Sequence, residues 1–282
     1  MRYCKILVKI TIIKYKSFTS MKKMTINSIK KSKGVTPLVM ITAYDALFAR
    51  LFQEEADVLL VGDSLNMSFA GKSDTLSATL EQMIYHTNAV AMGAKETFLI
   101  CDMPFGTYVN KKEALKNAIK VFQETPADAI KIEGGEDKAD IVAHLCSNGI
   151  AVCGHIGLLP QAVRSEGGYK VKGRSDEGRA SLIKDAKAIE KAGAFCIVIE
   201  GVKADVAAEV AKSVLIPVIG IGAGNGVDGQ VLVWSDMLGF FEEFTPKFVK
   251  KYLDGASLVK SAVKKYSDEV KTREFPQEIH TY

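Results

Sequence analysis

The chain has 282 residues, of which 48% are hydrophobic and 25% are charged. This composition excludes disordered and fibrous proteins, and the length suits one large globular domain. The net charge of +4 comes largely from one end, because residues 1–44 contain no Asp or Glu. The rest of the chain is slightly acidic and lacks the basic surface that a nucleic-acid-binding protein needs.

Residues 1–23 are interpreted as a basic extension that is not part of the fold, which leaves 24–282 for the domain. Lys9 interrupts the apolar stretch at 5–13, which is far shorter than the roughly 20 residues of a membrane span, so we predict no membrane segment. The favoured interpretation is an upstream extension of the reading frame, with Met21 or Met24 as the start. The alternative is an organelle-targeting segment.

The domain then alternates apolar strands with helical segments. Strands are predicted at 37–43, 58–63, 98–102, 129–133, 151–155, 196–200 and 217–224, with a further apolar segment at 231–239. A short helix and a loop are predicted within 25–34, and helical segments at 45–55, 80–94, within 103–125, and at 137–149, 176–193 and 202–214. Residues 245–272 are predicted to form terminal helices, with Thr245 as N-cap and Pro246 at the first helical position. About eight strand–helix units predict a single-domain (β/α)8 TIM barrel of the α/β class. An open, doubly wound sheet is the alternative.

Several of these strands end on a charged or imidazole side chain. In a barrel the carboxyl ends of the strands meet at one mouth, so residues far apart in the sequence become neighbours there. The residues expected to form one site are Asp63, Asp102, Lys131, Glu133, His155 and Glu200.

Asp63 and Asp102 end successive strands, and two carboxylates that approach one point repel unless a proton or a cation separates them. Oxygen ligands with room for water suit magnesium, and no Cys or His cluster has zinc spacing. The alternative is that each Asp caps the helix that follows it.

Lys131 and Glu133 are two residues apart on one strand, so both side chains should face the barrel interior. Glu133 could reach a cation through water, and Lys131 could neutralise a substrate carboxylate. A buried Lys131–Glu133 ion pair is the alternative. His155 is either a core histidine or a donor to a developing oxyanion.

Glu200 is far in the sequence from the two aspartates, and away from a metal it could keep a raised pKa and act as a general base. The alternative is an ion pair with Lys203. Together these residues favour metal-assisted proton abstraction next to a carbonyl.

Two other patterns carry less chemistry. The run GIGAGNG at 220–226 fits neither the dinucleotide nor the phosphate-loop motif, so we expect its glycines to form turns or close approaches. The five cysteines contain no C-x-x-C pair, which favours a reduced cytoplasm, and Cys101 and Cys153 are interpreted as structural.

Six motifs in order resemble the ketopantoate hydroxymethyltransferase family. They are VGDSL (61–65), CDMPF (101–105), KIEGGE (131–136), GHIGLLPQ (154–161), GGYKVKGR (167–174) and PVIGIGAGNGVDGQ (217–230). The Gly-rich stretch 156–175 is expected to be a mobile lid. Two departures from the family pattern are Asn66, where Gly is usual, and the stretch 237–248. Asn tolerates left-handed backbone angles, so the first should be mild.

The resemblance implies transfer of a hydroxymethyl group from 5,10-methylenetetrahydrofolate to 3-methyl-2-oxobutanoate through a Mg2+-stabilised enolate, giving 2-dehydropantoate for pantothenate synthesis. It implies a cytoplasmic homo-oligomer, typically a decamer. The roles that it carries over are Mg2+ ligands at Asp63, Asp102 and Glu133, substrate contacts at Asp63, Ser64, Asp102, Lys131 and His155, and the proton acceptor at Glu200.

Two rival hypotheses remain at this stage. One is another magnesium-dependent 2-oxo acid lyase or aldolase of the same barrel type, as isocitrate lyase relatives are. Cys153 lies near the position of that group's reactive cysteine but lacks the preceding basic residues. The other is a non-catalytic binding barrel, which would have no need of Glu200 as a base.

Overall fold

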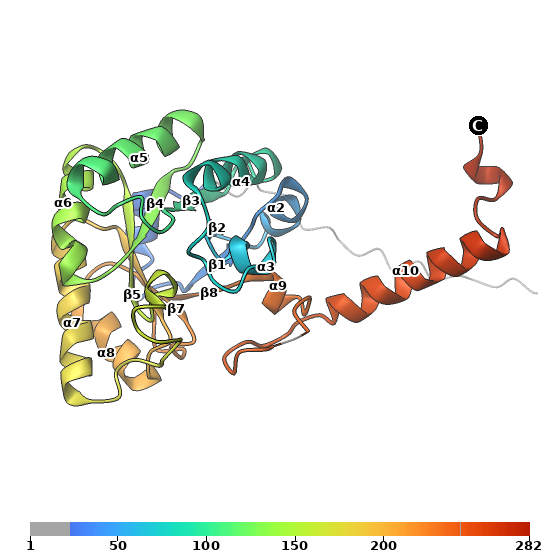
Figure 1. Cartoon of the computed structure of the whole chain (residues 1–282). Helices are drawn as coiled ribbons and strands as arrows, with labels where there is room; N and C mark the ends of the chain where they lie inside the picture. The colour runs from blue at the N-terminus through green and yellow to red at the C-terminus, as the bar shows by residue number, and fades with distance from the viewer. Residues whose placement is uncertain (1–22, 243) are drawn as a thin grey trace, which may run out of the picture.

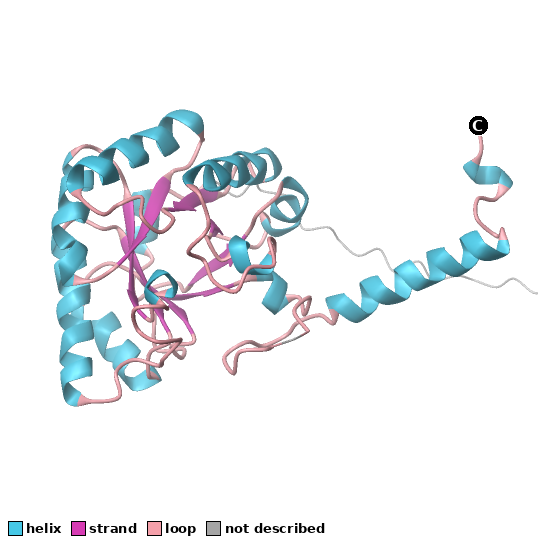
Figure 2. Cartoon of the chain, viewed as in Figure 1, coloured by secondary structure: helices cyan, strands magenta, loops and turns pink. Residues whose placement is uncertain are grey.

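The computed structural model describes residues 23–242 and 244–282, so most of the expected extension, residues 1–22, lies outside the described part. Eight parallel strands form a closed barrel (Figure 2). This confirms the predicted TIM barrel, and the open-sheet alternative is wrong because β8 pairs with β1. The strands are β1 (Leu38–Thr42), β2 (Val58–Val61), β3 (Phe98–Asp102), β4 (Ala129–Glu133), β5 (Val152–Gly157), β6 (Cys196–Glu200), β7 (Val218–Ile221) and β8 (Gly229–Leu232).

Longer helices cover the outside of the sheet, and most begin where the sequence places a capping residue. The side chains of Asp45, Thr79, Asn110 and Ser175 each accept a hydrogen bond from a backbone N–H of the first turn. The covering helices are α2 (Ala46–Phe52), α4 (Leu80–Gly93), α5 (Lys111–Glu124), α6 (Ala139–Ser147), α7 (Asp176–Lys191) and α8 (Ala204–Ser213), and the shorter ones are α1 (Ile26–Lys31), α3 (Leu65–Ser68) and α9 (Trp234–Met237).

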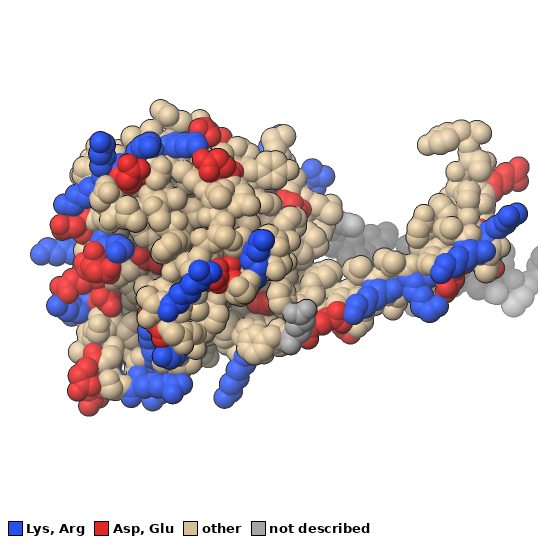
Figure 3. All heavy atoms as spheres, in the orientation of Figure 1, with Lys and Arg blue, Asp and Glu red and all other residues tan. Residues whose placement is uncertain are grey.

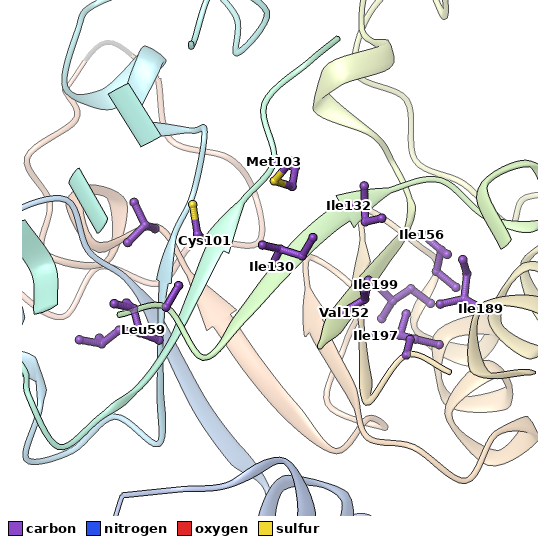
Figure 4. Close-up of a cluster of buried hydrophobic side chains, with 14 of the residues drawn as sticks. Leu59, Cys101, Met103, Ile130, Ile132, Val152, Ile156, Ile189, Ile197 and Ile199 are labelled. Atoms are coloured by element: carbon purple, nitrogen blue, oxygen red, sulfur yellow. The ribbon is translucent and has the colours of Figure 1, made fainter. Parts of the chain in front are cut away.

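Alternation along the strands divides the core into two layers. Outward-facing side chains pack under the helices, and Figure 4 shows Ile132, Ile156 and Ile199 on the same side as Ile189 of α7. The inward-facing set fills the amino-terminal half of the barrel, where Ile29 of α1 closes the cluster. At the carboxyl ends of the strands the same inward positions carry charged side chains instead. The barrel therefore has an apolar floor and a charged mouth.

The last two strands depart from the strand–helix rhythm. The loop 222–228 joins β7 to β8 without a helix, and after α9 the long helix α10 (Gly255–Thr272) extends away from the barrel (Figure 1). The predicted helix start at Thr245 and Pro246 is wrong, because residues 244–254 form an irregular segment.

Contacts with the barrel explain why this segment does not become helical. Tyr252 N donates to Met237 O and Gly255 N donates to Leu238 O, so the backbone of the segment bonds to the region of α9. The ring of Phe248 packs so closely on Gly222 that a Cβ there would lie 2.8 Å from it. These tertiary contacts override the local Thr-Pro start signal. In the described part of the chain, no helix is both long and apolar enough to cross a bilayer.

Candidate active site

The register between β3 and β4 brings a buried acid and a buried base together at the mouth. Asp102 and Lys131 are direct partners across the two strands, and Lys131 Nζ lies 2.8 Å from Asp102 Oδ1. Both side chains are at least 96% buried, with 3% and 4% of their surface exposed. Lys131 and Glu133 both face the barrel interior, as predicted. The ion pair of Lys131 is with Asp102, however, so the alternative of a Lys131–Glu133 pair is wrong.

His155 links the end of β4 to the end of β6. It pairs in register with Glu133, whose Oε1 lies 3.5 Å from His155 Nδ1. Its other nitrogen, Nε2, lies 3.4 Å from Glu200 Oε2. Glu200 keeps 21% of its side chain exposed, whereas His155 keeps 3%, so Glu200 is at the rim of the cluster. Its side-chain contact is with His155 and not with Lys203, which corrects the alternative drawn from the sequence.

Asp63 and Ser64 follow β2, which neighbours β3 on the side opposite to β4. They therefore flank Asp102 on the side away from Lys131. Asp63 N lies 3.4 Å from Asp102 Oδ2, to which it donates, and Ser64 Oγ lies 2.8 Å from the hydroxyl of Tyr44. The helix-cap interpretation fails for both aspartates, because Ser64 occupies the N-cap position of α3 and Asn110 that of α5. Asp63 and Asp102 are therefore available to the site.

One buried residue that the sequence analysis did not single out contacts this cluster at several points. Gln161 is in the short 3-10 turn Pro160–Ala162 after β5, and its Nε2 donates to Asp63 Oδ2 and to Met103 O, both at 2.9 Å. Its backbone N donates to Glu133 Oε2 at 3.0 Å, and its Oε1 accepts from the hydroxyl of Tyr108. The only sequence signal was its place in the GHIGLLPQ motif, which was interpreted as lid.

Burial and mutual repulsion set the charges of the carboxylates. Burial raises the pKa of Asp63 well above its usual value, and the charges of Asp102 and Glu133 act in the same direction. Burial also raises the pKa of Asp102, although Lys131 opposes it. For Glu133, burial is outweighed by the hydrogen bond and charge of His155 and by Lys131, so its pKa is lowered. Burial works to lower the pKa of Lys131, but Asp102 and Glu133 raise it, so Lys131 stays charged.

Glu200 has the pKa of a general base that works near neutral pH. Burial raises it to about 7, against the opposing charge of His155. An acid that titrates near the working pH can both take and return a proton. The mouth thus separates Glu200, a carboxyl whose pKa is close to neutral, from carboxylates held by Lys131 and Gln161.

The residues fit a magnesium ion by charge and by ligand type. Three carboxylates against one ammonium leave an excess of negative charge, and Glu133 Oε1 is a buried oxygen whose contact with His155 Nδ1 is long, at 3.5 Å, with no other partner among the described residues. Within residues 23–242 and 244–282, no three acidic, His or Cys side chains are already gathered as a closed metal centre. Magnesium does not need one, because it usually binds one or two carboxylates and keeps several waters.

Two loops cover the mouth and contact each other. Arg164, in the loop 156–175, donates to Asp74 Oδ2 at 2.8 Å, and Asp74 belongs to the loop after β2. Asn66 donates its amide to Asp74 O at 2.7 Å and to Ser77 Oγ at 3.0 Å. Asn66 lies in the helical turn α3, so the left-handed angle considered for it is not used. The mobility of the loop 156–175 stays a prediction.

The glycine and cysteine patterns fit their structural interpretations. Gly222 and Gly224 have positive φ angles, and a Cβ on Gly224 would lie 2.5 Å from Ala204, so both turn geometry and close packing require glycine. Burial raises the pKa of the Cys101 thiol to about 12. Cys153 is buried in the inward-facing apolar cluster and pairs in register with Lys131 on β4.

Comparison with known proteins connects this geometry to a family. Residues 23–278 match the sequence profile described as ketopantoate hydroxymethyltransferase. Proteins named 3-methyl-2-oxobutanoate hydroxymethyltransferase are 82% identical in Sulfurimonas denitrificans, over 93% of this chain and 99% of theirs, and 67% identical in Aliarcobacter butzleri, over 92% and 97%. The Helicobacter pylori protein of the same name is 53% identical, over 93% and 97%.

Solved structures show the same fold at low identity. Phosphonopyruvate hydrolase superposes with a TM-score of 0.60 at 14% identity, covering 91% of this chain and 90% of its own. A 2,3-dimethylmalate lyase described as a member of the PEP mutase/isocitrate lyase superfamily superposes with a TM-score of 0.58 at 15% identity, covering 92% and 89%. At this identity the likeness shows a shared barrel fold and nothing beyond it.

Proposed function

The chain belongs to the ketopantoate hydroxymethyltransferase family, and on that premise we propose that it transfers a hydroxymethyl group to 3-methyl-2-oxobutanoate and forms 2-dehydropantoate for pantothenate synthesis. We propose 5,10-methylenetetrahydrofolate as the one-carbon donor, Mg2+ as the metal and the cytoplasm as the location. The free thiols of Cys101, Cys146, Cys153 and Cys196 support a reducing compartment.

The observation that carries the proposal is the position of Glu200. It ends β6 at the rim of the mouth, faces the buried cluster through His155 at 3.4 Å, and has a pKa of about 7. A carboxyl with these properties can remove the proton from C3 of the keto acid and later return a proton to the new hydroxymethyl oxygen. A water molecule must supply that oxygen, because the methylene donor carries none, and tetrahydrofolate leaves. The lyase alternative is not favoured, because the family profile and the three high-identity relatives reported above bear the hydroxymethyltransferase name, and Cys153 is buried.

The remaining residues hold and orient the substrate in this proposal. Asp63 and Asp102 with Glu133 would hold the magnesium ion, which when bound withdraws electrons from the keto group and makes the C3 proton more acidic. Lys131 faces the same space and would neutralise negative charge that develops on the keto acid. Ser64 would contact the substrate carboxylate from the β2 end.

His155 has a geometric basis for its role as a substrate contact. It stands between Glu133 and Glu200, and its Nε2 makes a long contact of 3.4 Å with Glu200 Oε2 but no hydrogen bond among the described residues. A buried nitrogen without a hydrogen bond is costly unless a ligand supplies one. We propose that a substrate oxygen is this ligand, so His155 orients the reacting carbon relative to Glu200.

We also propose that the chain functions as a homo-oligomer, with a decamer as the expected size. Helix α10 presents an apolar stripe of Val259, Val263, Tyr266 and Val270, all at least 43% exposed. Figure 3 shows the charges of α10 along one edge of the helix and an uncharged surface on the other. A second copy is the favoured occupant, because the β7–β8 connection contains no helix and α10, which follows β8 and α9, extends away from its own barrel.

The decisive experiment follows the C3 proton. With the full chain, Mg2+ and 3-methyl-2-oxobutanoate in deuterated water, proton NMR should show loss of the C3 signal, and EDTA should stop it. Exchange that needs the metal but no folate supports metal-assisted abstraction at this substrate. If a folded, metal-bound protein gives no exchange with or without methylenetetrahydrofolate, the proposed substrate is wrong.

A further inference from the structure

The amide of Gln161 is locked in one orientation by its partners. A glutamine amide has two N–H donors on one side and an acceptor oxygen on the other. Met103 O can only accept, so Nε2 must face it and Asp63, and Oε1 must face the hydroxyl of Tyr108. A flipped amide would set its oxygen against a carbonyl and a carboxylate. Every polar atom of this buried side chain is therefore committed.

The same residue bonds to two of the carboxylates proposed to hold the metal. Its side chain occupies Asp63 Oδ2 and its backbone N–H occupies Glu133 Oε2. In each carboxylate the bond uses one oxygen and leaves the other without a bond to Gln161. On Glu133 that other oxygen, Oε1, is buried and makes only a long contact of 3.5 Å with His155 Nδ1 in the described part of the chain. Gln161 thus restrains both carboxylates through one oxygen each and leaves the other oxygen for a ligand.

Gln161 also belongs to the loop that covers the mouth. It sits near the start of the loop 156–175, which reaches across to Asp74 through Arg164. When this loop is seated, the two bonds from Gln161 to Asp63 and Glu133 are made. If the loop lifted, both carboxylates would lose a donor and become free to rotate.

We propose that Gln161 is a positioning residue that couples seating of the loop 156–175 to metal binding by Asp63 and Glu133. This inference rests on the proposed function, because it takes these carboxylates as metal ligands. Coupling between two binding events is reciprocal, so the seated loop tightens the metal and the metal tightens the loop. Residues that orient metal ligands through hydrogen bonds typically change metal affinity about 10- to 100-fold when removed.

The test uses the full chain and Mg2+ alone as the probe. Gln161→Met keeps the length of the side chain but removes its donors, and Tyr108→Phe removes the hydroxyl that orients the amide. Isothermal titration should show metal affinity about tenfold weaker in Gln161→Met and a smaller loss in Tyr108→Phe. Hydrogen–deuterium exchange should show that Mg2+ protects the amides of residues 156–175 in the native protein and no longer does so in Gln161→Met.

A matched variant on the same loop separates coupling from general loosening. Arg164→Gln cuts the surface contact with Asp74 and leaves Gln161 intact, so metal affinity should stay within about twofold. An equal loss in Arg164→Gln would overturn the specific role of Gln161. Unchanged affinity and unchanged metal-dependent protection in both Gln161→Met and Tyr108→Phe would also overturn it.

A further variant tells this inference apart from the proposed metal site. Asp102→Ala removes a proposed ligand that does not touch Gln161, so it should weaken Mg2+ binding whatever Gln161 does. Weak binding in Asp102→Ala with native binding in Gln161→Met contradicts the coupling alone. Native binding in both variants contradicts the metal assignment itself, and the coupling fails with it.

Discussion

The end of β4 and the helix α10 differ in which kind of side chain they bury and which they expose. At the end of β4, Lys131 and Glu133 are charged and buried, with 3% and 4% exposed, whereas on α10 Val263 and Tyr266 are apolar and exposed, with 60% and 58%. Both arrangements run against the usual distribution of residues in a folded protein. At β4 the free-energy cost of burying charged side chains is offset by neighbouring opposite charges, and the buried charges are available for catalysis. On α10 the exposed apolar side chains indicate a surface that binds a partner.

The largest effect should come from the rim of the mouth. Glu200→Gln keeps the shape of the side chain but cannot accept a proton, so C3 exchange should fall by about a thousandfold. Metal binding should stay native, because Glu200 lies beyond His155 from the proposed ligands. Proton NMR of C3 exchange checks the loss of activity, and calorimetric titration with Mg2+ checks that metal binding is unchanged. An exchange rate close to native would remove Glu200 as the base.

The same base should make catalysis depend on pH. Only ionised Glu200 can accept the proton, and its pKa is raised by burial to about 7. The exchange rate at low substrate should therefore rise as the pH increases through about 7 and level off above it. A rate that is flat between pH 5 and 9, with the protein folded throughout, would contradict this assignment.

The buried pair at β3 and β4 should respond far more strongly than a surface pair. Lys131→Met leaves the Asp102 carboxylate buried without its 2.8 Å partner, and we expect a loss of about 3 kcal/mol in the free energy of unfolding. Lys111→Met is the matched control, because its partner Asp140 is 88% exposed, and its effect should stay below about 0.5 kcal/mol. Denaturant unfolding of both variants would reveal the contrast, and equal losses would refute it.

Strand-end chemistry could be predicted from the sequence because barrel topology fixes it. Once Lys131 and Glu133 lie on one buried strand, alternation points both inward, and the parallel register sets them beside Asp102 and His155. The pairing within the mouth could not be predicted, because it depends on the stagger between strands, which apolar runs do not reveal. Gln161 could not be predicted for a related reason. It lies in a loop, and hydrophobic periodicity in the sequence does not predict where a loop runs or what it contacts.

The C-terminal part of the chain shows the limit of local signals. Thr245 and Pro246 form a good helix start, yet the chain stays irregular until Gly255 because Phe248 packs on Gly222. The apolar stripe of α10 is visible in the sequence as helical periodicity, but the sequence does not say whether it faces its own barrel. Only the structure shows that it projects away (Figure 1).

Glu200 should also reduce stability in a pH-dependent way. Its pKa in the folded protein is about 7, above the 4.5 of an exposed glutamate, so protonation favours the folded state. This contribution to stability is lost as the pH rises from about 4.5 to about 7. Glu200→Gln removes the penalty, so it should stabilise the protein by on the order of 2 kcal/mol at pH 8 and by almost nothing at pH 4.5. Thermal unfolding at both pH values checks this, and a gain that does not depend on pH would argue against it.

The smallest effect on the fold should come from the exposed face of α10. Changing Val263 and Tyr266 together to Glu places charge where the chain itself makes few contacts, so the free energy of unfolding of a single barrel should change by only about 0.5 kcal/mol. Sedimentation velocity should nevertheless show a shift to smaller species, because two buried charges per helix would oppose docking of a second copy. Lys264→Gln alters the polar side of the same helix, where the side chain is 77% exposed, and should leave the assembly intact. If the double variant sediments like the native protein, the stripe is not the contact between copies. The exposed apolar residues of α10 would then share with the buried charges of β4 only an unusual degree of burial, and no comparable role.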